Sequence, residues 1–314
     1  MTRLLLLVAL GCAVLAACDG GEGEERPSIP GAATLIDDPF SGGYPTYEHE
    51  PTGLRIVFGT PDLGVGPSRV SFALFDDDGI VSFPTLNVTT RSYPDGGDAS
   101  AVPGREVTLD FRPFPEGGRG IYTGTVDFDS AGLWSIDAAV PQPDGSFARV
   151  LFPVEVAEHS TAPAVGDPAP ASEHRTVADA YFDELTTSST PDPSLYNVEI
   201  PQALEAGRPF VVTFASPAFC TNALCGPQVE VLSELGATYR ERMDFIHVDL
   251  YENPHEIRGD LSVARRAPAL EEWGLHTDEW TFVVNADGLV AARFEGFAPI
   301  EEVEAAVQAV LLDP

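Results

Sequence analysis

The sequence predicts two folded domains, an all-β sandwich followed by an α/β domain. The first is indicated by short alternating apolar runs between residues 51 and 157, which are separated by turn-forming Pro, Gly and Asp. The second is indicated by a buried strand at Phe210–Phe214, which leads through two cysteines into an amphipathic helix. A length of 314 residues is enough for two hydrophobic cores with connecting segments.

Residues 1–18 have the features of an export signal. Arg3 precedes an apolar run that is too short to remain as a membrane span, and small residues precede Cys18. The segment L-A-A-C, which ends at Cys18, resembles the lipobox of bacterial lipoproteins. That resemblance implies cleavage before Cys18, lipid attached to its thiol, and a place at the extracytoplasmic face of the cell membrane. An ordinary secretory signal or an uncleaved anchor is the alternative.

The net charge of the chain restricts the partners that it can bind. All 17 basic residues are Arg, and 49 acidic residues give a formal net charge of −32. Such a chain should repel nucleic acid and anionic lipid, so we expect no nucleic-acid partner and attachment through lipid rather than charge.

Residues 19–50 are rich in Gly, Pro and acidic residues, and they predict a flexible acidic tether with Tyr47 and His49 at its surface.

Residues 51–157 predict a sandwich of short strands without a convincing helix. The segment V-D-F-D-S-A-G-L-W-S-I-D resembles the corner before a late strand of immunoglobulin-like domains, which implies that Trp134 is a core residue. The region contains no cysteine and no histidine, so we expect a spacer or docking module rather than a catalyst. The predicted strands are Leu54–Phe58, Arg69–Phe75, Leu86–Tyr93, Glu106–Phe111, Ile121–Phe128, Leu133–Val140 and Ala148–Val156.

Residues 158–176 predict a Pro- and Ala-rich linker, and residues 177–314 predict the α/β domain. The order of its elements and the position of its cysteines resemble the thioredoxin-like superfamily. The entry segment P-A-V-G-D-P-A-P resembles that of membrane-anchored thiol-disulfide reductases and peroxiredoxins. Besides Phe210–Phe214, the predicted elements are helices at Val177–Leu185 and Ser194–Gly207, a helix opened by Gly226 and Pro227, strand Asp244–Leu250, helix Pro268–Trp273, strands Thr281–Val284 and Leu289–Phe294, and a final helix from Pro299.

Cys220 and Cys225 are the candidate catalytic residues. Cys12 would leave with the export signal and Cys18 would carry lipid, so these two would be the free thiols of the mature chain. A cysteine at a helix N-terminus has its thiolate favoured by unpaired N–H groups and by the helix dipole. The resemblance implies that Cys220 attacks and Cys225 resolves. We therefore expect a monomeric thiol-disulfide oxidoreductase, without a cofactor, whose partners are envelope proteins with thiols or disulfides.

The chain departs from the usual pattern of this superfamily at several positions. Four residues separate the cysteines where the superfamily usually has two, and Phe219 stands where Trp is usual. Thr213 replaces the acid or amide often found in the central strand, so the sequence shows no evident buried proton acceptor. The cis-proline position aligns with Glu279 or Trp280, neither of which is proline, and this puts the usual substrate groove in doubt.

Two other functions stay open. Copper chaperones of the Sco type are also membrane-tethered thioredoxin folds, and their resemblance implies a copper site made by Cys220, Cys225 and His276. Soft thiolates and imidazole suit copper. The third interpretation is a tethered binding module that is not an enzyme, in which Cys220–Cys225 is a permanent structural disulfide.

Overall fold

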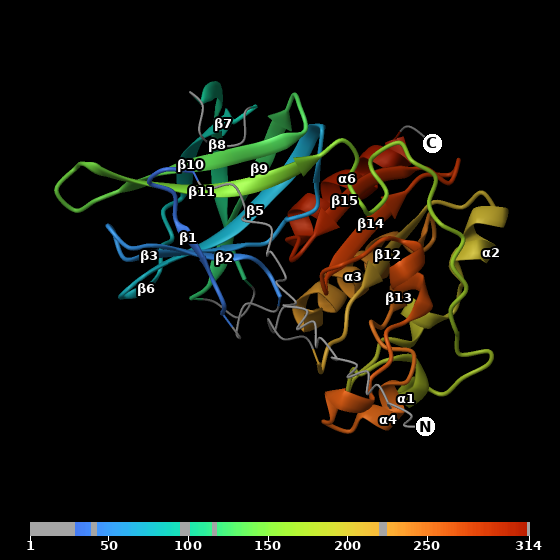
Figure 1. Cartoon of the computed structure of the whole chain (residues 1–314). Coiled ribbons are helices and arrows are strands. Elements are labelled where there is room, and N and C mark those ends of the chain that lie inside the picture. The colour runs from blue at the N-terminus through green and yellow to red at the C-terminus, as the bar shows by residue number, and fades with distance from the viewer. Residues whose placement is uncertain (1–28, 39–42, 95–100, 115–117, 220–224, 313–314) are drawn as a thin grey trace, which may run out of the picture.

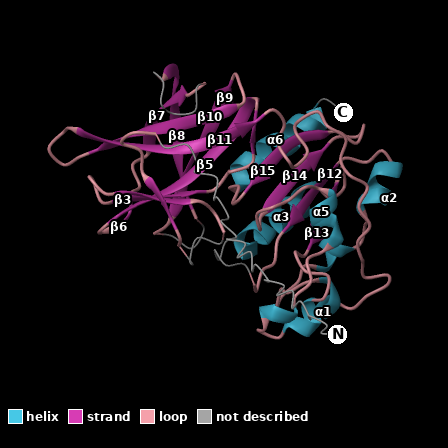
Figure 2. Cartoon of the chain, viewed as in Figure 1, coloured by secondary structure: helices cyan, strands magenta, loops and turns pink. Residues whose placement is uncertain are grey.

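The computed structural model describes residues 29–38, 43–94, 101–114, 118–219 and 225–312. A β-rich unit and an α/β unit lie beside each other, with the strands of the first on the left of Figure 1 and the helices of the second on the right (Figures 1 and 2). No helix in these ranges is long and apolar enough to cross a membrane.

The β-rich unit is built on one hydrogen-bonded sheet that folds over on itself. Within the described ranges its strand order is β1-β2-β3-β5-β9-β8-β7-β10-β11-β4, with β6 paired to β5. The strands are β1 Thr34–Ile36, β2 Thr46–His49, β3 Leu54–Phe58, β4 Leu63–Gly64, β5 Gly66–Asp76, β6 Gly79–Ile80, β7 Thr85–Ser92, β8 Val102–Pro113, β9 Gly120–Phe128, β10 Gly132–Pro141 and β11 Phe147–Ala157.

Aromatic side chains join the two ends of this sheet face to face. The ring of Phe152 on β11 lies 5.6 Å from that of Tyr47 on β2, 5.7 Å from Phe58 on β3 and 5.4 Å from Phe72 on β5. Strands far apart in the hydrogen-bonded order therefore face each other across one core, which gives the unit two layers. Trp134 is buried in this core, as predicted, and its indole N–H donates to the Ser130 carbonyl at 2.9 Å.

Each of the seven predicted strands overlaps an observed strand, but the tether prediction is wrong for the described part of residues 29–50. This part forms β1 and β2, and both Tyr47 and His49 are buried rather than at the surface. Both strands are short, so the sequence offers no sustained alternation from which to predict them. Contacts with residues distant in the sequence, such as Tyr47 with Phe152, order the segment instead.

The α/β unit contains a four-stranded sheet in the order β13-β12-β14-β15. Strand β12 is parallel to β13 and antiparallel to β14, and β14 is antiparallel to β15. This order, with a crossover helix between β12 and β13 and a final helix after β15, is the arrangement of the thioredoxin fold. The elements are α1 Phe182–Leu185, η1 Pro193–Tyr196, α2 Ile200–Glu205, β12 Phe210–Phe214, α3 Cys225–Tyr239, β13 Asp244–Val248, α4 Pro254–Ile257, η2 Leu261–Val263, α5 Pro268–Glu272, β14 Trp280–Val284, β15 Val290–Glu295 and α6 Ile300–Leu312.

Alternate side chains of the central strand enter different cores. Val211 packs in one cluster with Leu232 of α3 and Val307 of α6, whereas Val212 packs in another with Ala203 of α2 and Leu270 of α5. Helices therefore cover both faces of the sheet, which explains why β12 is apolar along its whole length.

Three helix predictions need correction. Residues 177–181 are not helical, so the first predicted helix is reduced to α1, and the predicted helix at residues 194–207 is divided into η1 and α2. Helix α3 begins at Cys225, one residue before the predicted opening at Gly226 and Pro227. A proline is tolerated in the first helical turn because the N–H groups there have no intrahelical partner.

The two units are joined by polar contacts as well as by the connecting chain. Arg69 of β5 donates to the Glu302 carboxylate at 2.8 Å and to the carbonyls of Glu295 and Phe297 at 3.1 and 2.9 Å. The rings of Phe114 and Phe297 meet edge to face, with centroids 5.1 Å apart. The β-rich unit is therefore packed against the end of β15 and the start of α6.

Candidate functional site

The candidate site lies where the chain leaves the carboxyl end of β12. Ala215 and Ser216 are completely buried, and residues 217–219 form a turn in which the Phe219 N–H donates to the Ser216 carbonyl at 3.2 Å. Cys18 and Cys220 lie outside the described residues, and of Cys225 only the backbone is described, as the start of α3. The structure therefore describes the segments on either side of the predicted cysteine pair, which are the turn after β12 and the start of helix α3.

A buried carboxyl group supports the turn that leads to Cys220. Asp249 follows β13 and is 3% exposed. Its Oδ2 accepts the Thr187 N–H at 2.8 Å and the Thr187 hydroxyl at 2.9 Å. The Thr187 oxygen in turn accepts the Ala218 N–H at 3.2 Å and lies 2.9 Å from Ser216 Oγ. Asp249 is thus connected through one hydroxyl to the backbone two residues before Cys220.

The pKa of the Asp249 carboxyl group is raised towards neutral pH. Burial raises its pKa to about 6, although hydrogen bonds from Thr187 and Tyr251 oppose this rise. A cavity of about 350 Å³ beside β13 is bordered by Asp249 and His247. A carboxyl group with this pKa can accept or release a proton close to physiological pH.

Asp249 was not predicted as a site residue, because the buried acid or amide of the superfamily was expected in the central strand, at the position of Thr213. Thr213, which occupies that position, is completely buried and lies 3.0 Å from the Thr281 hydroxyl. A signal was nevertheless present. Asp249 directly follows the apolar strand that is parallel to β12, and parallel neighbours end at the same edge of a sheet.

His247 stabilises the same edge without titrating near neutral pH. It is buried, and burial lowers its pKa to about 4. The neutral ring donates from Nε2 to the Ala215 carbonyl at 2.9 Å and accepts the Tyr196 hydroxyl at Nδ1, 2.8 Å away. His247 is therefore a packed strand residue of β13.

Gln228 connects the start of α3 to the sheet and was not singled out from the sequence. Its side chain is completely buried. Nε2 donates to the Thr281 hydroxyl at 3.1 Å, and Oε1 accepts the Ala298 N–H at 2.9 Å. The first turn of α3 is therefore fixed to β14 and to the segment after β15.

The structure places His276 on the surface, in the segment between α5 and β14. No group of three or more His, Cys, Asp or Glu side chains among the described residues has an arrangement that could hold a metal ion. The predicted copper set includes two cysteines whose side chains are outside that description, so it stays a prediction. Glu279 and Trp280, at the position of the expected proline, are both buried.

No protein-family model and no curated protein matches the chain. Among solved structures, it is similar to a putative thiol:disulfide interchange protein DsbE from Chlorobium tepidum, with 15% identity, coverage of 48% of this chain and 99% of that chain, and a TM-score of 0.35. A thiol:disulfide interchange protein of the thioredoxin family from Chlorobium tepidum TLS gives 16% identity, the same coverages and a TM-score of 0.33. A superoxide reductase (neelaredoxin) from Ignicoccus hospitalis gives 13% identity, coverage of 32% of this chain and 78% of that chain, and a TM-score of 0.20.

Proposed function

We propose that this chain is a thiol-disulfide oxidoreductase of the cell envelope, anchored by lipid at Cys18, which exchanges a Cys220–Cys225 disulfide with thiols of partner proteins. The observation that carries the proposal is the position of the cysteine pair between the end of β12 and the first turn of α3. In this position a thiolate is favoured by the unpaired N–H groups of the helix. The nearby carboxyl group of Asp249 supports it, because its pKa of about 6 suits proton exchange with a thiol.

The exchange takes place in two steps. The Cys220 thiolate attacks one sulfur of a partner disulfide, forms a mixed disulfide and releases the other partner sulfur as a thiolate. The Cys225 thiolate then attacks Cys220, which closes the Cys220–Cys225 disulfide and releases the second partner thiolate. Two electrons pass from the cysteine pair to the partner, and the reverse sequence oxidises a partner dithiol.

We assign the β-rich unit to the immunoglobulin-like sandwiches as part of this proposal. Its strand order supports the assignment, because β3-β5-β9 and β7-β10-β11 are hydrogen-bonded in these orders, with β8 paired to both β7 and β9. With β3 to β11 as strands A to G, and β4 and β6 left out, these runs are A-B-E and C-F-G, the strand order of immunoglobulin-like sandwiches, and strand D joins them. The polar contacts of Arg69 with the α/β unit favour a docking module over a free spacer.

The experiment is thiol trapping of the full-length chain across a series of dithiothreitol and glutathione potentials. We expect a Cys220–Cys225 midpoint potential above about −300 mV, in the range of exchangeable disulfides. Cys220→Ser should abolish turnover of a model disulfide. Unchanged exchange in that variant would refute the mechanism, and a potential well below this value would indicate a structural disulfide in a binding module.

The contribution of Asp249 is tested in the same assay. Asp249→Asn preserves the shape of the side chain but removes the titrating group, so the inflection of the exchange rate near pH 6 should disappear. Asp244→Asn is the matched control because Asp244 lies at the opposite end of β13 and pairs with Arg208 at 2.8 Å. An unchanged pH profile in Asp249→Asn would exclude Asp249 from the proton transfer.

A further inference from the structure

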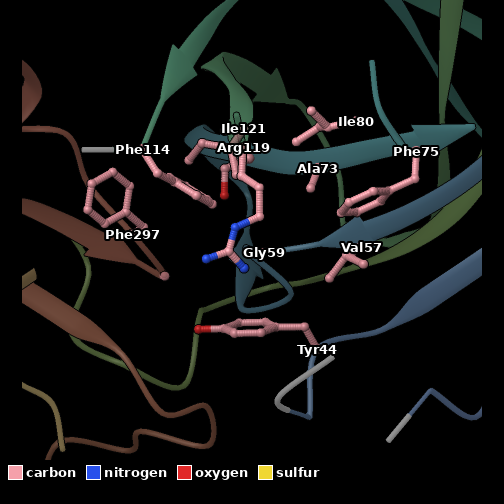
Figure 3. A pocket seen from close by; sticks show the side chains of 13 residues that line it. Tyr44, Val57, Gly59, Ala73, Phe75, Ile80, Phe114, Arg119, Ile121 and Phe297 are labelled. Carbon is pink, nitrogen blue, oxygen red and sulfur yellow. The ribbon is translucent and has the colours of Figure 1, made fainter. Parts of the chain in front are cut away.

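A pocket of about 150 Å³ lies at the junction of the two units. Its walls are mainly apolar and come from Val57, Ala73, Phe75, Ile80 and Phe114 of the β-rich unit and from Phe297 after β15. Figure 3 shows Arg119 reaching into this space above the ring of Tyr44. A volume of this size accommodates about one benzene ring.

Three polar groups of the pocket have no hydrogen-bond partner within the described chain. Arg119 is exposed, and no ion pair or side-chain hydrogen bond joins it to a described residue. Ser71 is 1% exposed and its hydroxyl has no partner in the described residues. Tyr44 is 5% exposed, and its hydroxyl approaches Thr277 without reaching hydrogen-bond geometry. Buried hydroxyls without partners are unusual and costly, which points to a polar ligand atom.

All three groups are able to donate hydrogen bonds. Burial, together with the charges of Glu279 and Glu295, raises the pKa of Tyr44 well above its ordinary value, so its hydroxyl keeps the proton. Ser71 is a neutral hydroxyl, and Arg119 is permanently charged. Donors that converge on an apolar pocket suit a ligand with acceptor atoms and an apolar body.

The charge of the ligand follows from Arg119 and from the rest of the chain. Arg119 is the one charged residue among the described residues that line the pocket. A planar guanidinium matches a carboxylate through two parallel hydrogen bonds. With a formal net charge of −32, the protein repels multiply charged anions, so a monoanion is favoured.

We propose that this pocket binds a small monocarboxylate with one aromatic or branched apolar group, held by Arg119, Ser71 and Tyr44. The apolar group occupies the space between Phe75 and Phe297, and the carboxylate lies at the exposed guanidinium. The pocket shares its edge of the α/β sheet with the cysteine segment, because Glu295 pairs with Trp280 and Trp280 pairs with Phe214 at the end of β12. Binding does not depend on thiol exchange, so the site can be tested separately.

The test is calorimetric titration of the full-length chain with phenylacetate and with its neutral isostere, phenylacetamide. We expect phenylacetate to bind at one site, with a Kd on the order of millimolar or below, as small ligands allow. The amide should bind about tenfold more weakly, because it lacks the charge-assisted hydrogen bonds. Absence of phenylacetate binding, or equal affinity for acid and amide, would overturn the proposal.

Variants locate the site. Arg119→Gln should reduce phenylacetate affinity about tenfold and leave phenylacetamide binding unchanged. Ala73→Leu should weaken both ligands by filling the pocket. Arg105→Gln is the control, because Arg105 is exposed and pairs with Asp127 on the β-rich unit, outside the pocket lining. Unchanged phenylacetate affinity in both Arg119→Gln and Ala73→Leu would place the ligand elsewhere.

A peptide with a free C-terminal phenylalanine tests whether the pocket prefers a small free acid or the C-terminus of a polypeptide. Acetyl-Gly-Gly-Phe carries the same ring and carboxylate on a longer chain. Tighter binding of this peptide than of phenylacetate would overturn the assignment to a small acid and indicate a protein C-terminus. Weaker binding of the peptide would support the assignment.

Discussion

Asp62 holds the two units together, so its substitution tests how strongly they are docked. Its Oδ1 accepts the Thr161 N–H and hydroxyl, both at 2.8 Å. Its Oδ2 accepts the Ala162 N–H at 3.0 Å and Arg293 at 2.8 Å. Asp62→Asn preserves the size of the side chain but places an amide group among these donors. One oxygen acceptor and the partner charge of Arg293 are lost.

The expected loss of stability is about 2 kcal/mol. Breaking a buried ion pair from one side costs about 3–5 kcal/mol, mainly through the charge that stays unpaired. The side chains of Asp62 and Arg293 are 14% and 17% exposed, so water reduces this cost. An unpaired N–H at Ala162, which is buried, adds about 1 kcal/mol or more. With the ion-pair cost reduced by this exposure to about 1 kcal/mol, the two contributions together give about 2 kcal/mol.

The contribution of Asp62 should also depend on pH. Burial by itself raises its pKa, but the Thr161 N–H, the Arg293 charge and the Ala162 N–H lower it below 3.8 in the folded chain. The folded state therefore binds fewer protons than the unfolded state in this range. The stabilisation is present above about pH 3.8 and is lost as the pH falls through the folded pKa.

Urea unfolding followed by tryptophan fluorescence and circular dichroism measures the effect. Asp110→Asn is the control, because Asp110 pairs with Arg112 at 3.0 Å on the surface of one unit, with side chains 54% and 38% exposed. The control should lose at most about 1 kcal/mol. If Asp62→Asn lost no more than Asp110→Asn at pH 7, the contacts of Asp62 would not stabilise the docked state.

Two further predictions concern Glu295 and copper. Burial raises the pKa of Glu295 to about 8, so the free energy of unfolding should fall as the pH rises from about 4.5 to 8. Glu295→Gln should flatten this pH dependence in urea titrations, whereas the exposed control Glu301→Gln should leave it unchanged. The same slope in Glu295→Gln and the parent chain would show that another group titrates. If the copper hypothesis holds, the full-length chain binds about one Cu(I) in a competition titration with a Cu(I) chelator. His276→Ala should then lower the Cu(I) affinity about tenfold or more, whereas His255→Ala should leave it unchanged. Absence of binding by the parent chain would remove the hypothesis.

The sequence allowed the longer strands to be predicted because their periodicity is local. Strands β3 and β12 were predicted at their observed bounds. An alternating run such as β3, or an almost wholly apolar run such as β12, has few other interpretations when turn-forming residues flank it. Strands β1 and β2 were missed because their order depends on partners elsewhere in the chain. Tyr47 carries no sign of burial until Phe152, more than a hundred residues later, packs against it.

The candidate site was only half predictable for the same physical reason. The strand, the cysteines and the following helix form one continuous segment, so their order is visible in the sequence. The polar groups around them come from other segments, with Thr187 before the strand and Asp249 after the next one. Hydrogen-bond geometry selects Asp249 among 49 acidic residues, and composition cannot make that selection.

The contacts between the two units give the β-rich unit a closer relation to the cysteine segment than a spacer would have. Arg69 donates to the Phe297 carbonyl, and the next residue, Ala298, donates its N–H to Gln228 in the first turn of α3. Cys225 is three residues before Gln228 on the same helix. A displacement of the β-rich unit would therefore have to break the Arg69 contact or move the segment that fixes the start of α3. Because buried hydrogen bonds are costly to leave unmade, the docked position of the β-rich unit and the position of this helix start are set together.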